Sequence, residues 1–150
     1  MLREGVLLGG LPRQTCPAPT CGFVWWDNPV PVVAALVEYR GNLVLARNHA
    51  WAAGAFGLIT GFLERDEDPA NAVRREVMEE LDLEASAASL IGIYPFPRNN
   101  EILMAYHVIA DGVIRLNEEL AEYRLIPPGK LRAWDYGTGF AVRDWLAARS

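Results

Sequence analysis

The feature that most constrains this chain of 150 residues is one segment, residues 61–83, in which a glycine is followed by regularly spaced carboxylates. Asp68 followed by Pro69 is typical of a helix start, because aspartate accepts hydrogen bonds from free N–H groups and proline fits the first turn. We therefore predict a helix from about Pro69 to Leu81. The apolar residues that would pack one face of this helix on a core are Ala70, Val73, Val77 and Leu81.

Three glutamates of this helix, Glu76, Glu79 and Glu80, fall within one narrow arc, because successive helical residues are rotated by about 100°. Carboxylates this close repel one another, and a hard divalent cation with oxygen ligands would compensate that repulsion. Magnesium commonly takes part of its shell from phosphate oxygens. The pattern therefore predicts a magnesium or manganese site with a phosphate-bearing substrate; an exposed acidic helix is the alternative.

The segment resembles the Nudix box, G-x5-E-x7-R-E-U-x-E-E-x-G-U, in which U is a bulky apolar residue. The matching positions are Gly61, Glu67, Arg75, Glu76, Val77, Glu79, Glu80 and Leu83. Asp82 stands where that family has glycine. Aspartate adopts the left-handed backbone region less readily than glycine but better than most residues, so we expect a small stability cost and an intact metal site.

The resemblance implies an α/β protein with the Nudix fold, an α/β/α sandwich with a mixed β-sheet, over residues 29–150. Hydrophobic patterning predicts a turn at residues 39–42 and an amphipathic helix over residues 138–149. The predicted strands are residues 30–38, 43–47, 55–62, 90–94, 101–110 and 122–126.

Composition limits the classes of ligand and environment. The chain is 51% hydrophobic and 22% charged, as expected for a folded domain with an ample core. Residues 64–84 hold nine acids and three bases, a net charge of -6, so the rest of this chain of net charge -5 is about neutral. No basic face is left for an extended nucleic acid. Contact with only the end of an RNA remains compatible with this charge. No apolar run reaches membrane-spanning length and no signal-peptide core is present, so we expect a cytoplasmic protein.

Further segments resemble the NADH pyrophosphatase branch of the Nudix family. Residues 94–97, Tyr-Pro-Phe-Pro, are similar to its W-P-F-P core, and residues 137–141 are similar to its nucleotide-contacting G-T-x-A. The polar S-Q-P that precedes that core is replaced here by residues 91–93, Ile-Gly-Ile. The resemblance implies Tyr94, Phe96 and Ala141 as substrate-binding residues, and Trp26 and Phe62 are added because aromatic faces stack bases. The alternatives are that residues 94–97 form a rigid loop packed on the core and that Trp26 covers a sheet edge.

Residues 1–28 resemble half of a zinc ribbon, with Cys16 and Cys21 as its two cysteines. A structural zinc ion normally takes four ligands, so a second subunit would have to supply the other pair; a metal-free loop is the alternative. This arm also carries Trp25 and Trp26, which so short an extension cannot bury by itself. We therefore expect a homodimer.

The resemblance implies hydrolysis of the pyrophosphate bond in a nucleoside diphosphate derivative that is NAD(H)- or ADP-ribose-like, with two or more Mg²⁺ or Mn²⁺ ions. The implied catalytic residues and metal ligands are Glu76, Glu79, Glu80 and Glu119, together with backbone carbonyls of Thr60 or Gly61. Glu67 and Arg75 are expected to form a structural ion pair. The alternatives are a non-catalytic nucleotide-sensing module, or an enzyme for oxidised nucleoside triphosphates or NAD-capped RNA.

Overall fold

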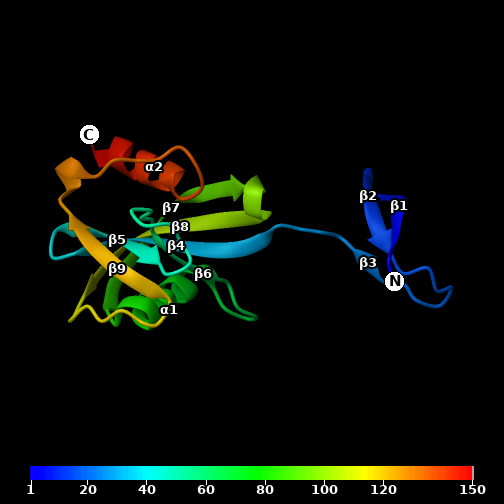
Figure 1. Cartoon of the computed structure of the whole chain (residues 1–150), viewed down its shortest axis with the longest axis horizontal. Coiled ribbons are helices and arrows are strands. Elements are labelled where there is room, and N and C mark those ends of the chain that lie inside the picture. Colours follow the sequence, from blue (N-terminus) through cyan, green and yellow to red (C-terminus); the bar gives the residue numbers. More distant parts are fainter. Residues whose placement is uncertain (150) are drawn as a thin grey trace.

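The computed structural model describes residues 1–149, and most of them form a six-stranded mixed sheet between two helices (Figure 1). The sheet has the order β7-β8-β4-β5-β9, with β6 also paired to β4. Strands β4 and β8 are parallel and the other pairs are antiparallel. The strands are β4 (Val30–Tyr39), β5 (Asn42–Asn48), β6 (Ile59–Phe62), β7 (Glu84–Phe96), β8 (Glu101–Asp111) and β9 (Leu120–Ile126).

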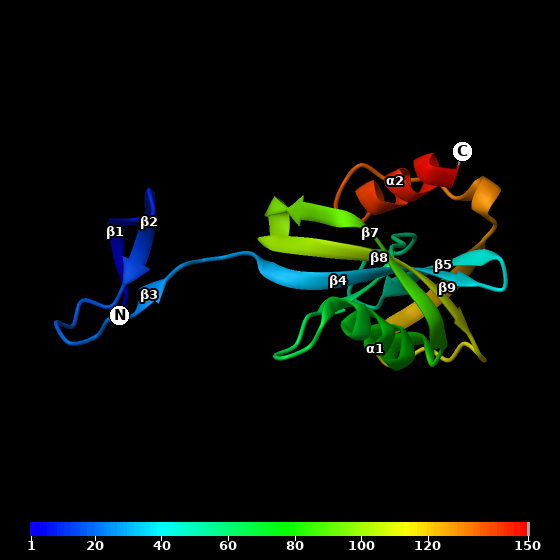
Figure 2. The ribbon, with the colours of Figure 1, turned by 180° about the vertical axis from the view of Figure 1, so that it is seen from behind.

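The two helices, α1 (Pro69–Leu81) and α2 (Gly139–Arg149), lie on opposite faces of this sheet (Figures 1 and 2). The arrangement is the α/β/α sandwich with a mixed sheet that the resemblance to the Nudix family implies. Two short 3-10 turns, Pro97–Asn99 and Pro128–Lys130, complete the domain. Within residues 1–149, no helix combines the length and the apolar character that crossing a membrane requires.

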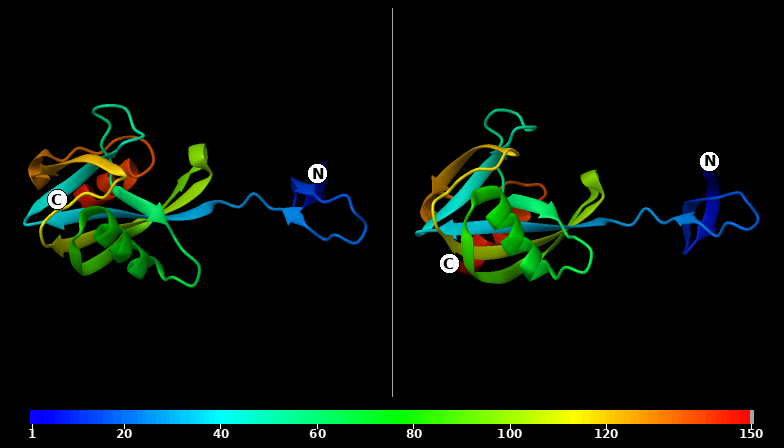
Figure 3. Two further views of the ribbon diagram at one scale, coloured as in Figure 1. Left: turned by 60° about the horizontal axis from the view of Figure 1, so that its bottom comes forward. Right: turned by 90° about the horizontal axis from the view of Figure 1, so that it is seen from below.

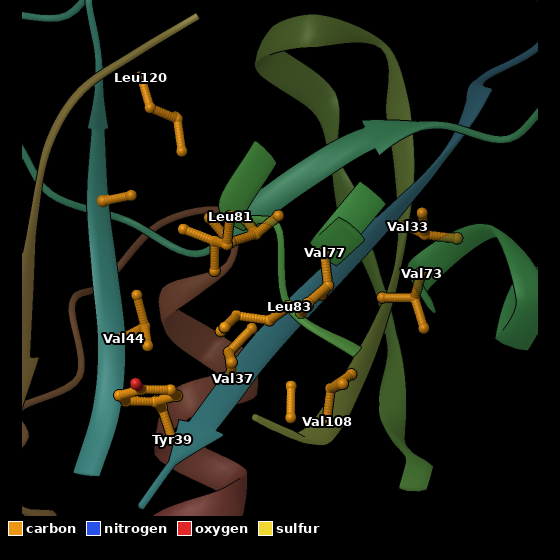
Figure 4. Packing of buried hydrophobic residues seen from close by; sticks show 14 of the residues in the cluster. Val33, Val37, Tyr39, Val44, Val73, Val77, Leu81, Leu83, Val108 and Leu120 are labelled. Atoms are coloured by element: carbon orange, nitrogen blue, oxygen red, sulfur yellow. The ribbon is translucent and has the colours of Figure 1, made fainter. Parts of the chain in front are cut away.

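Strand β4 is buried on both faces, which explains its nearly continuous apolar sequence. Val33 and Val37 point to the α1 side, where they join Val73 and Val77 of the helix (Figure 4). Val32, Ala34 and Leu36 alternate with them and belong to the second core cluster, which contains Val142 and Trp145 of α2. The sheet is thus fixed between two separate apolar layers.

Helix α1 begins and ends where the local sequence predicts. The Asp68 carboxylate accepts a hydrogen bond of 3.0 Å from the Asn71 backbone N–H, so Asp68 is the N-cap. Asp82 takes the left-handed conformation, with φ 59° and ψ 35°, and its N–H donates to the Met78 carbonyl. Aspartate therefore ends the helix in the geometry for which glycine is better suited.

The turn between β4 and β5 also agrees with its sequence. Arg40 and Gly41 both have positive φ, of 50° and 84°, which is typical of a tight two-residue hairpin turn. Tyr39 and Asn42 pair directly on either side of it.

The prediction of a strand over residues 55–62 is wrong in its first half, because only Ile59–Phe62 forms β6. Before it, Gly57 makes a single bridge to Ala46, with two hydrogen bonds of 2.9 and 3.0 Å. Strand β5 pairs with β4 near one end of β4, and β6 pairs with β4 near the other. The two strands therefore diverge, and residues 49–58 cross the opening as a loop.

The prediction of a strand over residues 90–94 is too short, because β7 extends over thirteen residues and includes Pro95 and Phe96. Its pairing with β8 shifts register between Ala85 and Ala87 and again between Leu90 and Gly92. Each irregularity interrupts the alternation of inward and outward side chains. The period-two pattern that identifies a strand in sequence is therefore broken in β7.

The first residues form a small antiparallel sheet of β1 (Arg3–Leu8), β2 (Leu11–Thr15) and β3 (Val24–Trp25). It stands apart from the main sheet at the end of an extended connection in every view (Figures 1, 2 and 3). Three aromatic side chains of this arm remain about half exposed: Phe23, Trp25 and Trp26. The arm, defined as residues 1–28, therefore carries apolar surface that its own sheet does not cover.

Candidate functional site

A cleft of about 790 Å³ opens beside β6 and the C-terminal half of α1. It is also bounded by the loop of residues 49–58, by the end of β7 and by the segment before α2. The predicted metal ligands that line it are Thr60, Gly61, Glu76, Glu79 and Glu119. Two predicted substrate-binding residues, Phe62 and Phe96, line it as well. The tertiary structure thus gathers residues from segments far apart in the sequence at one site.

Gly61 allows the Glu76 carboxylate to lie directly against the β6 backbone. A Cβ atom at Gly61 would stand 2.0 Å from the Glu76 carboxyl carbon and 2.1 Å from Oε1, far inside van der Waals contact. The glycine is therefore required by close approach, since no positive φ is found there. This contact explains why a glycine in β6 and a glutamate in α1 occur together in the sequence motif.

Arg75 forms the ion pair with Glu67 that the sequence predicts, and it does so through two parallel contacts. Its Nε and Nη2 donate to the two Glu67 carboxylate oxygens at 2.6 and 2.9 Å. This guanidinium holds the pKa of Glu67 far below its ordinary value, at about 2. Nη1 donates to Glu76 at 2.8 Å and to Glu79 at 3.2 Å, and Nη2 also reaches the Phe62 carbonyl. Arg75 therefore fixes the loop and the glutamates, with its N–H groups directed at protein oxygens.

Glu80 is a buried carboxyl group among other carboxyl groups. Its side chain belongs to a residue only 5% exposed, and burial together with the charges of Glu76 and Glu119 raises its pKa to about 8. Burial likewise raises the pKa of Glu76, although Arg75 opposes that shift. A buried anion without a compensating cation is costly, so these glutamates favour either a proton or a metal ion.

The donor set fits a hard divalent cation. Its side-chain donors are carboxylate oxygens, and Thr60 and Gly61 of β6 line the same cleft, which suits Mg²⁺ or Mn²⁺ better than zinc. Across residues 1–149, no three His, Cys, Asp or Glu side chains are already close enough to hold an ion unaided. The arrangement explains this: Arg75 occupies oxygens of Glu76 and Glu79. An ion would have to exchange with that guanidinium and draw on phosphate or water for its remaining ligands.

Three predicted substrate-binding residues do not line the cleft. The Tyr94 hydroxyl donates to Asp144 of α2 at 2.7 Å, and the ring packs in the core, so the alternative interpretation of a core-packed aromatic applies to it. Ala141 is completely buried because it faces the sheet from α2. Trp26 lies in the arm, where the Arg13 guanidinium stacks on its ring. Packing of α2 on the sheet places Tyr94 and Ala141, and the separate arm places Trp26; a local sequence pattern specifies neither.

The two cysteines lie next to each other in the arm. Both are free thiols, and a hydrogen bond with Cys21 lowers the pKa of Cys16. Neither residue is among those that line the cleft. Two thiols are fewer than the four ligands that a structural zinc ion normally takes.

Sequence reasoning missed several residues that line the cleft. They come from the loop of residues 49–58 and from the segments around the two 3-10 turns: Trp51, Phe56, Arg98, Trp134, Tyr136 and Thr138. The only local signal for Trp51 and Phe56 was the presence of two aromatic residues in a loop otherwise rich in Ala and Gly. Thr138 does belong to the segment that resembles G-T-x-A, but Thr138 faces the cleft and Ala141 does not.

The chain is similar to known proteins over most of its length. A family model described as NUDIX domain matches residues 28–146. A protein named NAD-capped RNA hydrolase NudC from Mycobacterium bovis (strain BCG / Pasteur 1173P2) is 30% identical over 134 residues, which cover 87% of this chain and 41% of that protein. The protein of the same name from Pseudomonas aeruginosa (strain LESB58) is 28% identical over 95 residues, which cover 63% and 34%. The chain therefore spans less than half of the length of these relatives.

Solved structures share the fold. A NUDIX hydrolase from Nitrosomonas europaea superposes with a TM-score of 0.74 at 23% identity, covering 87% of this chain and 74% of that one. The E. coli ORF135 protein superposes with a TM-score of 0.65 at 22% identity, covering 82% and 92%. Both similarities extend over the sandwich of sheet and helices described above.

Proposed function

This chain belongs to the NUDIX domain family, and on that premise we propose that it is a metal-dependent hydrolase of pyrophosphate bonds in nucleoside diphosphate derivatives. The observation that carries the proposal is the pair of buried glutamates, Glu76 and Glu80, beside Glu119. Glu76 and Glu119 line the open cleft, and Glu80 lies next to them without lining it. Buried carboxylates repel one another and are unfavourable unless a cation lies between them. A purely nucleotide-sensing domain would have no need to keep them.

The proposed mechanism assigns roles to residues of the cleft. Glu76 and Glu80 would hold Mg²⁺ or Mn²⁺, with Glu79 and Glu119 as further ligands, and a backbone carbonyl of Thr60 or Gly61 beside them. When bound, the ions would neutralise charge on the phosphoryl oxygens and promote attack by water. The alternative role for Glu79 is that of general base, because its side chain is about half exposed and lines the cleft. Arg75 positions these groups without contacting substrate.

The proposed substrates are NAD(H)-like and ADP-ribose-like pyrophosphates. Aromatic residues line the cleft on several sides, and aromatic faces stack nucleobases. The name of the similar mycobacterial protein refers to NAD-capped RNA, which contains the same pyrophosphate bond. Residues 91–93 supply no side-chain hydrogen-bond groups to read a nicotinamide amide. We therefore propose catalytic efficiencies for NADH and ADP-ribose within about a hundredfold of each other.

Assembly and location are part of the same proposal. We propose a homodimer in which the arm covers apolar surface of a second copy, supported by a groove that contains Phe23, Trp25 and Trp26. In such a dimer a second pair of cysteines would be needed for zinc; without it the Cys16–Cys21 loop stays metal-free. A cytoplasmic location remains the prediction from sequence.

The experiment that tests the function is a turnover assay of the purified chain with Mg²⁺ or Mn²⁺. Its substrates are NADH, NAD, ADP-ribose, diadenosine polyphosphates, an oxidised nucleoside triphosphate and a short NAD-capped RNA. We expect cleavage at the pyrophosphate of NADH and ADP-ribose, with no turnover in excess chelator. Binding of these nucleotides without any hydrolysis would instead identify a nucleotide-sensing module.

A further inference from the structure

The aromatic residue with the most unusual setting in the cleft is Trp51, in the loop between β5 and β6. Both views of Figure 3 show this loop extending beyond the edge of the sheet. The indole lies against the backbone of Gly57, where a Cβ would stand 3.3 Å from two carbons of the ring. Trp51 nevertheless remains 39% exposed, and it lines the cleft. One part of the ring is supported by backbone and the rest is open.

Short-range hydrogen bonds hold the Trp51 backbone in place. Its N–H donates to the Asn48 carbonyl at 2.9 Å, and its own carbonyl accepts from Arg47 Nη1 at 3.3 Å. The Asn48 side chain in turn accepts from the Ala50 N–H at 2.8 Å. A ring presented on a turn of this kind loses little conformational freedom when a ligand stacks on it.

The indole itself has no partner that would explain it as a structural residue. In the described part of the chain, no hydrogen bond, ring contact or cation contact involves the Trp51 side chain. The neighbouring Phe56, by contrast, is covered by Arg124 at 4.0 Å. A large aromatic surface that is rigid, half open and unpaired is typical of a stacking platform for a ligand.

The position of Trp51 along the cleft matches the geometry of a two-ring substrate. The strand that starts beyond Gly57 leads past Thr60 and Gly61, where the glutamates lie, to Phe62, whose side chain is 61% exposed. The five residues that follow Gly57, up to Phe62, span at most roughly 17 Å when fully extended. The loop also meets the acidic side of the cleft, because the His49 N–H donates to the Glu119 carbonyl at 3.0 Å. Two exposed rings therefore lie on this stretch of chain, with the predicted metal site between them.

We propose that Trp51 stacks the second ring of dinucleotide pyrophosphates, while Phe62 stacks the base that all ADP-containing substrates share. This inference rests on the proposed function and adds a basis for substrate choice. A dinucleotide such as NADH would use both rings, one on each side of the pyrophosphate. ADP-ribose, which has one base, would use Phe62 alone.

The test compares Trp51→Ala with the conservative Trp51→Phe on NADH and ADP-ribose. We expect Trp51→Ala to lower kcat/KM for NADH by about ten- to hundredfold, mostly through KM, while kcat/KM for ADP-ribose stays within about threefold. Trp51→Phe keeps an aromatic face and should retain most of the NADH activity. Phe62→Ala should lower kcat/KM for both substrates together.

A second readout does not depend on turnover. Calorimetric titration with NMN and AMP, the two products of NAD hydrolysis, in the presence of Mg²⁺, should show that Trp51→Ala weakens NMN binding and leaves AMP binding unchanged. An equal loss for NADH and ADP-ribose, or for NMN and AMP, would overturn the inference, because Trp51 would then only support the loop and Glu119. If the wild-type chain hydrolyses neither substrate, the proposed function fails and this inference fails with it.

Discussion

At the scale of single residues, the site depends on how closely a backbone and a carboxylate approach each other. Gly61 leaves room for the Glu76 carboxylate, and Arg75 ties that carboxylate to Glu67 and Glu79. Arg75 therefore fixes two of the proposed metal ligands, and an ion would have to exchange with its guanidinium. The electrostatic cost of gathering these carboxylates is that burial, with the charges of Glu76 and Glu119, raises the pKa of Glu80 to about 8.

Replacing a proposed metal ligand should remove activity and keep the fold. Glu76→Gln or Glu80→Gln deletes one charged ligand and also relieves repulsion among buried carboxylates. We expect kcat to fall by at least about a hundredfold at saturating Mg²⁺, with an unchanged or higher free energy of unfolding. Glu84→Gln, an exposed change just beyond α1, is the matched control and should be silent. Near wild-type turnover in either ligand variant would refute the metal assignment.

Adding one methyl group at Gly61 should separate activity from stability. In Gly61→Ala the three atoms nearest the new Cβ would all belong to the end of the Glu76 side chain, which can move aside. The fold should therefore lose no more than about 1 kcal/mol, while displacement of Glu76 lowers kcat/KM by at least about tenfold. Gly129→Ala, where a Cβ would meet open space, is the control. Urea unfolding and steady-state kinetics on both variants would check this; full activity in Gly61→Ala would contradict it.

At the scale of elements, α1 is ended by a residue that is not ideal for the task. Asp82 adopts φ 59°, a conformation that glycine reaches without strain. The Asp82 N–H donates to the Met78 carbonyl and so satisfies the end of the helix. This bond requires the left-handed conformation but does not require aspartate.

Restoring glycine at this helix end should stabilise the protein. Asp82→Gly is expected to raise the free energy of unfolding by about 0.5 to 1 kcal/mol, because the strain of the left-handed conformation disappears. Asp82→Ala should act in the opposite direction by a similar amount, since alanine has no polar group to tolerate that conformation. Equilibrium unfolding in urea measures both. Equal stability of the two variants would show that this position carries no strain.

The contact between β7 and α2 predicts a dependence of stability on alkaline pH. Burial, followed by the hydrogen bond to Asp144, raises the pKa of Tyr94 from 10.0 to about 12. Above pH 10 the phenol of the unfolded chain loses its proton while the folded one keeps it. The contribution of Tyr94 is thus complete below pH 10 and is lost as the pH rises to about 12, by up to ~2 kcal/mol.

The effect on stability of removing the Tyr94 hydroxyl should therefore depend on pH. Tyr94→Phe should lower the free energy of unfolding at pH 7 by about 1 kcal/mol, through the lost hydrogen bond to Asp144. At pH 11 the difference from wild type should shrink or change sign. Tyr123→Phe, at an exposed position of β9, is the control. A difference that stays constant from pH 7 to pH 11 would contradict the account.

At the scale of the whole molecule, the arm and the main domain differ in how completely they bury their apolar side chains. The domain covers its apolar residues with two helices, whereas the arm leaves Phe23, Trp25 and Trp26 about half exposed. Aromatic surface of this kind is typical of an interface.

The arm should therefore hold two copies together. Light scattering at micromolar concentration is expected to give twice the 16.6 kDa of one chain. Trp25→Asp should shift that mass toward the monomer, while Leu90→Asp, an equally exposed apolar position of β7, should leave it unchanged. A monomeric mass for the wild-type chain would end the proposal of a homodimer.

Much of the site was predictable because its determinants are local in sequence. The limits of α1 follow from Asp68, Pro69 and Asp82, and the arc of glutamates follows from helical periodicity. The hairpin turn at Arg40 and Gly41 is likewise specified within four residues. Capping, periodicity and turn preferences each act over a few residues, so the sequence by itself determined these features.

Only the tertiary structure decided which aromatic residues face the cleft. Tyr94 turns toward the core because α2 packs over it, and Ala141 is buried because it lies on the face of α2 that packs on the sheet. Trp51 faces the cleft because β5 and β6 diverge around its loop. The full length of β7 depended on its irregular pairing with β8. Each of these outcomes is set by contacts between segments far apart in the chain, which no local pattern of residues encodes.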